Sequence, residues 1–381
     1  MRHLLSSLGR RLPAIVVLSL LAVSPAAAYD TPARAAILVD FDTGQVLFEK
    51  NADQPVPPAS MSKLMTLLMV FERLADGSLS LDDTLPVSEK AWRKGGSKMF
   101  VEVGHRVRVE DLLHGIAIQS GNDACIVVAE GLAGSEDAFA ELMNKRARDL
   151  GLTNTNLRNA SGWPAPDHMM SVRDLALLSG IVIRNYPQHY PLFSQREFEY
   201  NGIKQYSRNP LLRQNVGADG LKTGYTEESG YSLVASAERD GRRLIMVLAG
   251  LGTPAARARE GERLLEHGFR NFANYHLVTA GQTIEQADVW LGSESRIALV
   301  PEESVTLTLT REQRQDLRVK VIYNTPVPAP VARGAPVGHI EISAPGLETR
   351  KVALVAEQDV AAATLFGRVG SAIGYLLWGA S

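Results

Sequence analysis

Apolar residues recur three and four positions apart over several stretches of the chain, which is the spacing of an amphipathic helix. The clearest stretch covers residues 60–74, and Pro57 and Pro58 prevent a helix from beginning much earlier. The same spacing predicts further helices over 109–118, 122–132, 136–150, 172–183 and 257–272. We therefore expect this part of the chain to be rich in helices.

Two β-hairpins are predicted in the same region. Residues 35–40 and 46–48 are apolar runs on either side of the turn Asp42-Thr43-Gly44. Residues 231–237 and 243–251 form a second pair of runs, joined by Asp240-Gly241, a dipeptide typical of tight hairpin turns.

The pattern changes after about Tyr275. Short Val-rich strands are predicted over 305–309, 319–322 and 351–355, and no convincing helix is found. Four prolines interrupt this region: Pro326, Pro328, Pro330 and Pro336. A small all-β domain over residues 276–360 is therefore predicted.

Both ends of the sequence carry apolar segments. Residues 1–28 have the layout of an export signal, with a basic start, an apolar run and the small residues Ala26-Ala27-Ala28 at the cleavage point. Residues 361–381 are predicted to form an amphipathic helix, with Arg368 as their charged residue, that anchors the chain to a membrane surface. The segment is also just long enough to span a bilayer, so both arrangements stay open.

Charge and composition exclude several classes of function. With 40 Lys and Arg residues against 42 Asp and Glu residues, the net charge of −2 argues against a nucleic-acid partner. The single cysteine, Cys125, excludes an internal disulfide and a cysteine-rich metal site. No two histidines have the spacing of a zinc hydrolase, so we expect neither a metal nor another cofactor.

Ser60 and Lys63 lie three positions apart at the start of a predicted helix, so they share one face of it. A serine hydroxyl becomes an effective nucleophile when a neighbouring base removes its proton. A lysine can be that base only if burial or another cation lowers its pKa. The pair alone is a weak indication, because a serine at a helix start is ordinarily an N-cap.

Two later motifs strengthen the hypothesis of catalysis. Ser120-Gly121-Asn122 lies between two predicted helices, and Lys222-Thr223-Gly224 precedes the strand predicted over 231–237. Ser-x-x-Lys, Ser-x-Asn and Lys-Thr-Gly, in this order, are the signature of serine penicillin-binding proteins and serine β-lactamases. The ordered set predicts a serine acyl-transfer site.

With these motifs the chain resembles the low-molecular-mass penicillin-binding proteins that are D-alanyl-D-alanine carboxypeptidases of the penicillin-binding protein 5 type. The resemblance is close over about residues 35–272, including segments 58–66, 121–125 and 220–226, and is weaker beyond them.

The resemblance implies an α/β catalytic domain of the transpeptidase-like type over residues 29–275, in which helices cover a β-sheet. The all-β domain over 276–360 and the terminal amphipathic helix over 361–381 would then place this catalytic domain near a membrane.

The resemblance also assigns roles to the motif residues. Ser60 would be the acylated nucleophile, Lys63 its base, and Ser120 the hydroxyl that relays a proton to the leaving D-alanine. Asn122 would hold the peptide group of the substrate. Lys222 would keep the pKa of Lys63 low and attract the substrate carboxylate.

Further substrate-binding residues follow from the same resemblance. In the segment Thr223-Gly224, the threonine hydroxyl would bond the carboxylate. The backbone N–H of Tyr225 would form an oxyanion hole with the backbone N–H of Ser60. Some relatives have a histidine at the position of Tyr225. Because the main chain supplies the donor, this difference should alter the rate more than the type of reaction. Arg208 and Arg259 align with two active-site arginines, of which the second steers the carboxylate. The neighbouring Arg257 is interpreted as part of a solvated helix face.

The expected enzyme is a serine-type carboxypeptidase, exported to the periplasmic face of the inner membrane, that cleaves peptidoglycan stem peptides and is covalently inhibited by β-lactams. A D,D-endopeptidase or transpeptidase would share the acyl-serine and differ in the second nucleophile. A class A β-lactamase would need a Glu-x-x-Leu-Asn segment, which the sequence lacks. A non-catalytic peptidoglycan-binding scaffold is disfavoured because all three motifs are intact.

Overall fold

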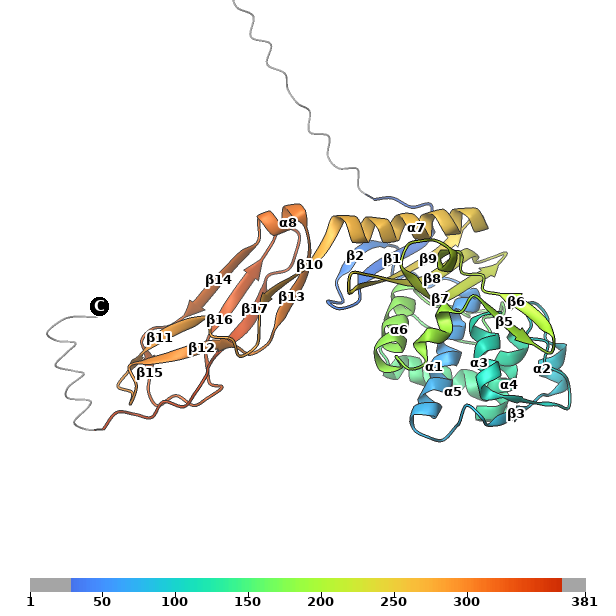
Figure 1. Ribbon diagram of the computed structural model, residues 1–381, viewed down its shortest axis with the longest axis horizontal. Helices are drawn as coiled ribbons and strands as arrows, with labels where there is room; N and C mark the ends of the chain where they lie inside the picture. Colours follow the sequence, from blue (N-terminus) through green and yellow to red (C-terminus); the bar gives the residue numbers. More distant parts are fainter. Residues whose placement is uncertain (1–28, 365–381) are drawn as a thin grey trace, which may run out of the picture. The chain divides into compact units, whose positions relative to one another are not determined.

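A five-stranded antiparallel sheet forms the centre of the first domain in the computed structural model, which describes residues 29–364 (Figure 1). The strand order is β2-β1-β9-β8-β7, so the hairpin at the start of the domain pairs with the one near its end. The bounds are β1 (Ala35–Asp40), β2 (Val46–Lys50), β7 (Ala218–Thr226), β8 (Gly230–Arg239) and β9 (Arg242–Leu251).

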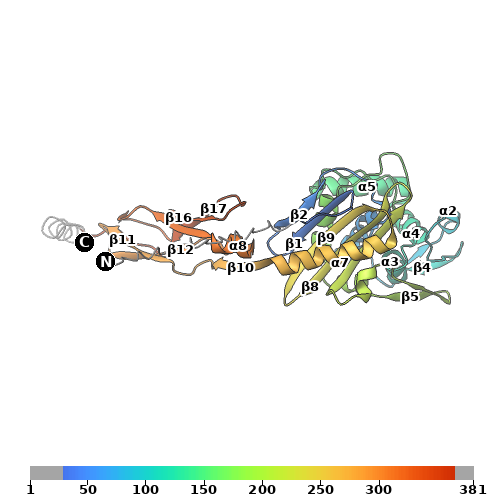
Figure 2. The ribbon, with the colours of Figure 1, turned by 90° about the horizontal axis from the view of Figure 1, so that it is seen from above.

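Helices cover both faces of this sheet. Helix α7 (Pro254–Asn271) lies across β1, β9 and β8 on one face, and the remaining helices lie on the other (Figures 1 and 2). They are α1 (Lys63–Ala75), α2 (Glu89–Arg93), α3 (Val109–Ala117), α4 (Asn122–Ala133), α5 (Glu136–Asp149) and α6 (Val172–Asn185), with the 3₁₀ turns η1 (Ala59–Ser62) and η2 (Tyr190–Ser194). A third 3₁₀ turn, η3 (Pro210–Arg213), packs against α7. Two short strand pairs are added, β3 (Thr84–Pro86) with β4 (Arg106–Arg108) and β5 (Glu197–Tyr200) with β6 (Ile203–Tyr206).

Local sequence explains why these helices form. On α1, Leu64, Leu68 and Phe71 are fully buried, and each such side chain contributes roughly 1.5–3 kcal/mol when removed from water. At the start of α5 and of α6, the side chains of Ser135 and Ser171 accept bonds from backbone N–H groups, caps that typically contribute ~1 kcal/mol. The predicted helices and both predicted hairpins of this domain are confirmed.

The second domain is built from β-strands around a core of its own. The pair β10 (Phe272–Val278) and β13 (Val305–Thr310) accompanies a six-stranded sheet of order β14-β16-β17-β12-β11-β15. The bounds are β11 (Glu285–Trp290), β12 (Arg296–Pro301), β14 (Arg318–Tyr323), β15 (Val327–Pro328), β16 (Pro336–Ser343) and β17 (Arg350–Ala356).

The expectation that this domain contains no helix is wrong for one short segment, α8 (Arg311–Gln315). Thr310 caps the helix, and the side chain of Gln313 bonds back to the backbone N–H of Thr310, which completes a capping box. A helix this short shows little more than one turn of periodicity, so the apolar pattern could not indicate it.

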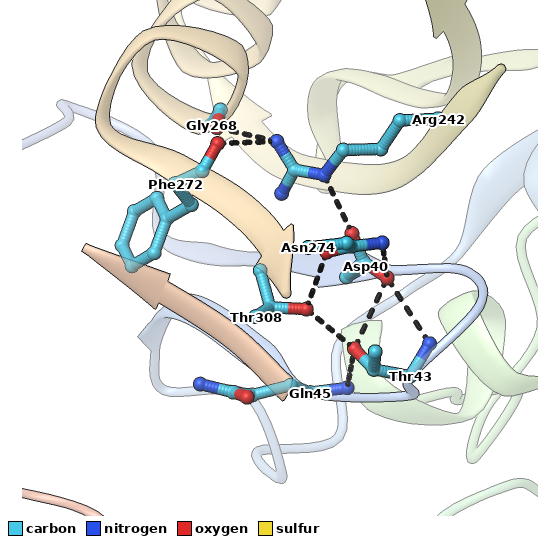
Figure 3. Close-up of polar contacts among 8 residues, drawn as sticks. All are labelled: Asp40, Thr43, Gln45, Arg242, Gly268, Phe272, Asn274 and Thr308. Carbon is cyan, nitrogen blue, oxygen red and sulfur yellow. Dashed lines mark hydrogen bonds and ion pairs between the residues drawn. The ribbon is translucent and has the colours of Figure 1, made fainter. Parts of the chain in front are cut away.

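A buried polar cluster bonds the first sheet to β10 and β13 (Figure 3). The fully buried Asp40 accepts bonds from Arg242, at 2.8 Å, and from Asn274, at 3.2 Å. The hydroxyls of Thr43 and Thr308 lie 2.6 Å apart, and Arg242 also donates to the carbonyl of Phe272. Because an unpaired buried charge is costly, loss of one partner of the Asp40 pair should destabilise the fold by about 3–5 kcal/mol.

The predicted terminal segments lie almost wholly outside the described residues. This holds for the export signal at 1–28 and for positions 365–381 of the predicted C-terminal helix. The described start of that helix is not helical, because Ala362 forms a β-bridge with Gly292. Within residues 29–364, no helix combines the length and the apolar character needed to cross a membrane.

Candidate functional site

The turn that carries Ser60 lies between Pro57-Pro58 and α1. Ser60 is in the turn η1, and Lys63 is the first residue of α1. Ala59, just before the serine, has a left-handed backbone conformation with φ of +47°, which is strained for a residue with a side chain. The Nζ atom of Lys63 lies 2.8 Å from the Oγ atom of Ser60.

Lys63 is fully buried, and its amine has three oxygen neighbours. Besides Ser60, these are the Oδ1 atom of Asn122, at 2.8 Å, and the carbonyl of Ser161, at 2.5 Å. Burial is the main cause that lowers the pKa of Lys63 to about 8. A neutral amine that donates to Asn122 and Ser161 points its lone pair at Ser60, so this lysine is arranged to receive the serine proton.

Ser120 and Lys222 come from different elements and meet beside this pair. Ser120 lies in the loop between α3 and α4, with φ of +62°, and accepts a bond from the Lys222 Nζ atom at 3.0 Å. Lys222 is buried on β7, the edge strand of the sheet. Burial, and then the charge of Lys63, lowers its pKa well below the usual value.

The start of α4 is held in place by its own polar side chains. The Nδ2 atom of Asn122 donates to the carbonyl of Gly95, at 3.0 Å, so the loop before Met99 orients this amide toward Lys63. The buried carboxylate of Asp123 accepts bonds from three consecutive backbone N–H groups at 99–101. Asp123 therefore fixes the loop and does not face the reacting groups.

A cavity of about 480 Å³ opens onto these residues. Its walls come from the turn that carries Ser60, the α3–α4 loop with the start of α4, β7, three further loops and α7. They are formed by Ser60, Gly96, Ser97, Ser120, Asn122, Ser161, Gly162, Trp163, Pro164, Arg208, Thr223, Gly224, Tyr225, Thr226 and Arg257. A larger hollow of about 1180 Å³ beside the cluster of Figure 3 contains none of the motif residues, so the chemistry points to the smaller cavity.

Two glycines let the walls approach the turn that carries Ser60 closely. A Cβ atom on Gly224 would lie 2.9 Å from the carbonyl oxygen of Pro58, and one on Gly162 would lie 1.9 Å from that of Ala59. The glycine of the Lys-Thr-Gly motif therefore has a steric reason: it allows β7 to pack directly against the turn that carries Ser60.

The two arginines predicted from the resemblance differ in their placement. Arg208 lines the cavity and donates to the Ser97 hydroxyl at 2.6 Å. Arg259 is exposed and does not line the cavity, whereas Arg257 lines it and lies over the ring of Tyr231. The interpretation of Arg257 as part of a solvated helix face is therefore wrong.

The pattern along α7 could have separated these two arginines. Gly261, Leu264, Leu265 and Gly268 are its buried residues. Arg257 precedes them by four, seven, eight and eleven positions and so shares their face, whereas Arg259 is rotated by about 200° from Arg257.

Several residues of the wall were not predicted, and three of them make specific contacts. Ser161 supplies its backbone carbonyl, Ser97 anchors Arg208, and Trp163 presents an exposed ring with Lys94 at 4.6 Å from its centroid. Each belongs to a loop without a motif, so nothing in the sequence singled them out. Among the described residues, no group of three or more His, Cys, Asp or Glu side chains could hold a metal ion.

Comparisons with known proteins cover most of the chain. Residues 22–253 match the family described as D-alanyl-D-alanine carboxypeptidase, and residues 272–362 match the penicillin-binding protein 5 C-terminal domain. The D-alanyl-D-alanine carboxypeptidase DacC of Escherichia coli is 39% identical over 345 residues, which cover 88% of this chain and 86% of the relative.

Solved structures show the same similarity. Penicillin-binding protein 5 from Haemophilus influenzae has a TM-score of 0.78 and 32% identity, covering 88% of this chain and 100% of its own. Penicillin-binding protein D2 from Listeria monocytogenes, solved in an ampicillin-bound form, has a TM-score of 0.59 and 33% identity, covering 64% of this chain and 99% of its own.

Proposed function

Because the chain belongs to the D-alanyl-D-alanine carboxypeptidase family, we propose that it removes the terminal D-alanine from peptidoglycan stem peptides through an acyl-enzyme formed on Ser60. The observation that carries the proposal is the environment of Lys63: a buried amine with a pKa near 8, 2.8 Å from the serine hydroxyl. Such an amine is neutral in a useful fraction of molecules near neutral pH.

The acylation step follows from this geometry. Lys63 takes the proton from Ser60 as the serine Oγ atom attacks the carbonyl carbon of the scissile peptide bond. The developing oxyanion is stabilised by the backbone N–H groups of Ser60 and Tyr225. Asn122 donates to the peptide group on the acyl side of the substrate.

The leaving group departs as an amine and needs a proton. Ser120 gives its hydroxyl proton to the nitrogen of the departing D-alanine and is reprotonated from the neighbouring lysines, one of which holds the proton of Ser60. The contact between Lys222 and Ser120, at 3.0 Å, supports this relay.

The substrate carboxylate lies at the cationic end of the cavity. Lys222 attracts it, the Thr223 hydroxyl bonds it, and Arg208 lines the same cavity. We place Arg257 in this set, in the position that the resemblance gave to Arg259, because Arg257 lines the cavity. Three cationic side chains around one carboxylate should favour a free C-terminus over a continuing peptide.

Water then hydrolyses the acyl-serine, which makes the reaction a carboxypeptidation and not a transpeptidation. The test is mass spectrometry of a pentapeptide ending in D-alanyl-D-alanine after incubation with the purified protein. We expect the wild-type protein to remove one alanine from the peptide and the Ser60→Ala variant to be inactive. An unchanged peptide, or an active Ser60→Ala variant, would overturn the proposal.

β-Lactams should acylate the same serine. Penicillin-binding protein D2 from Listeria monocytogenes has been solved in ampicillin-bound and cefotaxime-bound forms. Gly151 to Pro166, downstream of Ser120, contains no acidic residue that could activate a deacylating water in the manner of a class A β-lactamase. A long-lived penicilloyl-enzyme is therefore expected.

A further inference from the structure

The strained turn before Ser60 is held by hydrogen bonds that the reaction itself does not use. The carbonyl oxygen of Ala59 accepts a bond from the hydroxyl of Ser62, at 3.0 Å. The same oxygen lies against Gly162, where an added Cβ would approach it to 1.9 Å. Since Ala59 has φ of +47°, its conformation persists only because these surroundings enforce it.

A buried histidine continues this set of bonds. The backbone N–H of Arg158 donates to the Nδ1 atom of His168, at 3.0 Å, and the Nε2 atom lies 3.3 Å from the Ser62 hydroxyl oxygen. A backbone N–H can only donate, so Nδ1 carries the lone pair and the proton of a neutral ring is on Nε2. His168 therefore donates to Ser62, and Ser62 donates to Ala59.

The ring stays neutral over the working pH range. His168 is buried, and the charged groups that face it are Lys63 on α1 and Arg158 on its own loop. Burial, followed by these two cations, lowers the pKa of His168 to about 4. Protonation would place a hydrogen on Nδ1 against the Arg158 N–H and break the hydrogen bond between Arg158 and His168.

We propose that His168 is a positioning residue for acylation: through Ser62 and Ala59 it holds the turn that aligns the Ser60 hydroxyl and backbone N–H with Lys63. His168 lies outside the walls of the 480 Å³ cavity, and its ring bonds to Arg158 and Ser62 rather than to Ser60 or Lys63. The inference rests on the proposed function, because acylation of Ser60 is the step that this alignment serves.

Two amide variants, each of which reproduces the position of one ring nitrogen, separate the two bonds of the ring. His168→Asn keeps an acceptor near Nδ1 and removes the donor to Ser62, whereas His168→Gln keeps a donor near Nε2. With the full-length protein and a fluorescent penicillin, we expect the acylation rate constant to fall about tenfold in His168→Asn, since small misalignments at a reacting centre are costly. His168→Gln should stay within about twofold of wild type. The dissociation constant of the noncovalent complex should be unchanged in both.

Ser62→Ala tests the next bond with little change in volume. It should lower the acylation rate as much as His168→Asn does. The acylation rate of the double variant should be no lower than that of either single variant, because both substitutions interrupt the same series of hydrogen bonds. His189→Asn is the matched control. The ring of His189 stacks on that of Phe71 in α1, with the ring centroids 5.0 Å apart, and His189 is not among the described residues that line the cavity. Its acylation rate should equal that of wild type.

Several results would overturn the inference. The first is a wild-type acylation rate in His168→Asn. The second is an equal decrease of the rate in the Asn and Gln variants, and the third is an additive decrease in the double variant. If His168→Asn does not fold, the acylation rate of Ser62→Ala and the ¹⁵N NMR spectra of the wild-type histidines test the proposal instead. A ring proton on Nδ1 of His168 would contradict it. A wild-type protein that fails to react with penicillin would instead overturn the proposed function.

Discussion

Lys63 shows how much of the chemistry depends on the surroundings of a single residue. Its pKa of about 8 lies below the usual value because the amine is buried. In the proposed mechanism the neutral form is the base, so acylation should increase as pH rises through about 8 and then level off. Rates of penicillin labelling from about pH 5 to pH 10 would measure this.

Lys63→Arg should abolish labelling, because a guanidinium keeps its proton. Lys145→Arg, at an exposed helix position paired with Asp149, is the matched control and should label normally. A flat pH profile, or an active Lys63→Arg variant, would rule out the role of this lysine as the base.

The two arginines of α7 provide a second prediction at this scale. Arg257→Gln should raise the KM for a peptide ending in a free carboxylate by about tenfold or more, because a charge-assisted hydrogen bond contributes roughly 1.5–3 kcal/mol. Arg259→Gln should change it little, since this side chain is exposed outside the cavity walls. Steady-state kinetics of both variants would check this, and the reverse order of effects would favour the original alignment.

At the scale of elements, the site depends on how closely β7 packs against the turn η1. In Gly224→Ala, the new Cβ would lie 2.9 Å from the Pro58 carbonyl oxygen, so the strand or the turn must move. We expect acylation to fall more than tenfold and the free energy of unfolding to decrease by about 1–3 kcal/mol.

Penicillin labelling and chemical denaturation would measure both effects of Gly224→Ala. Gly252→Ala is a suitable control, because nothing lies within 4 Å of its added Cβ. Wild-type labelling by Gly224→Ala would show that the close approach of β7 is not required.

At the scale of the whole molecule, we propose that residues 365–381 of the predicted C-terminal segment anchor the enzyme peripherally to the periplasmic side of the membrane. Truncation after Thr364 would keep the backbone bonds that Ala361 and Ala363 make with Ser293 and Leu291. The truncated enzyme should leave the membrane fraction and react with penicillin at the wild-type rate, because the catalytic domain keeps its core.

Fractionation with high salt and with alkaline carbonate would test the anchor. High salt should release little of the full-length protein, since the segment carries little charge and binds by apolar burial. Membrane retention of the truncated form would place the anchor elsewhere. Failure of carbonate to extract the full-length form would favour a spanning helix.

The sequence by itself determined the elements and the class of enzyme. Helix α1 follows from apolar residues at helical spacing, and the hairpin β8–β9 from its Asp240-Gly241 turn, because both depend on neighbours within one segment. The order of the three motifs predicted a serine acyl-transfer site, and the resemblance to a family that these motifs support implied the fold class and a carboxypeptidase. The comparisons confirm the family, the fold class and the carboxypeptidase. The domain boundaries and the individual roles of the site residues stay predictions.

Only the tertiary structure decided how the site is assembled. Three of its features join segments that are distant along the chain. They are the contact of the Ser161 carbonyl with Lys63, the face of α7 that presents Arg257 to the cavity, and the bond between His168 and Ser62 in the turn that carries Ser60. The pKa of Lys63 depends on burial by several such segments, and no spacing within one segment encodes it. A local pattern fixes which residues share a strand or a helix face, whereas reactivity depends on which faces meet.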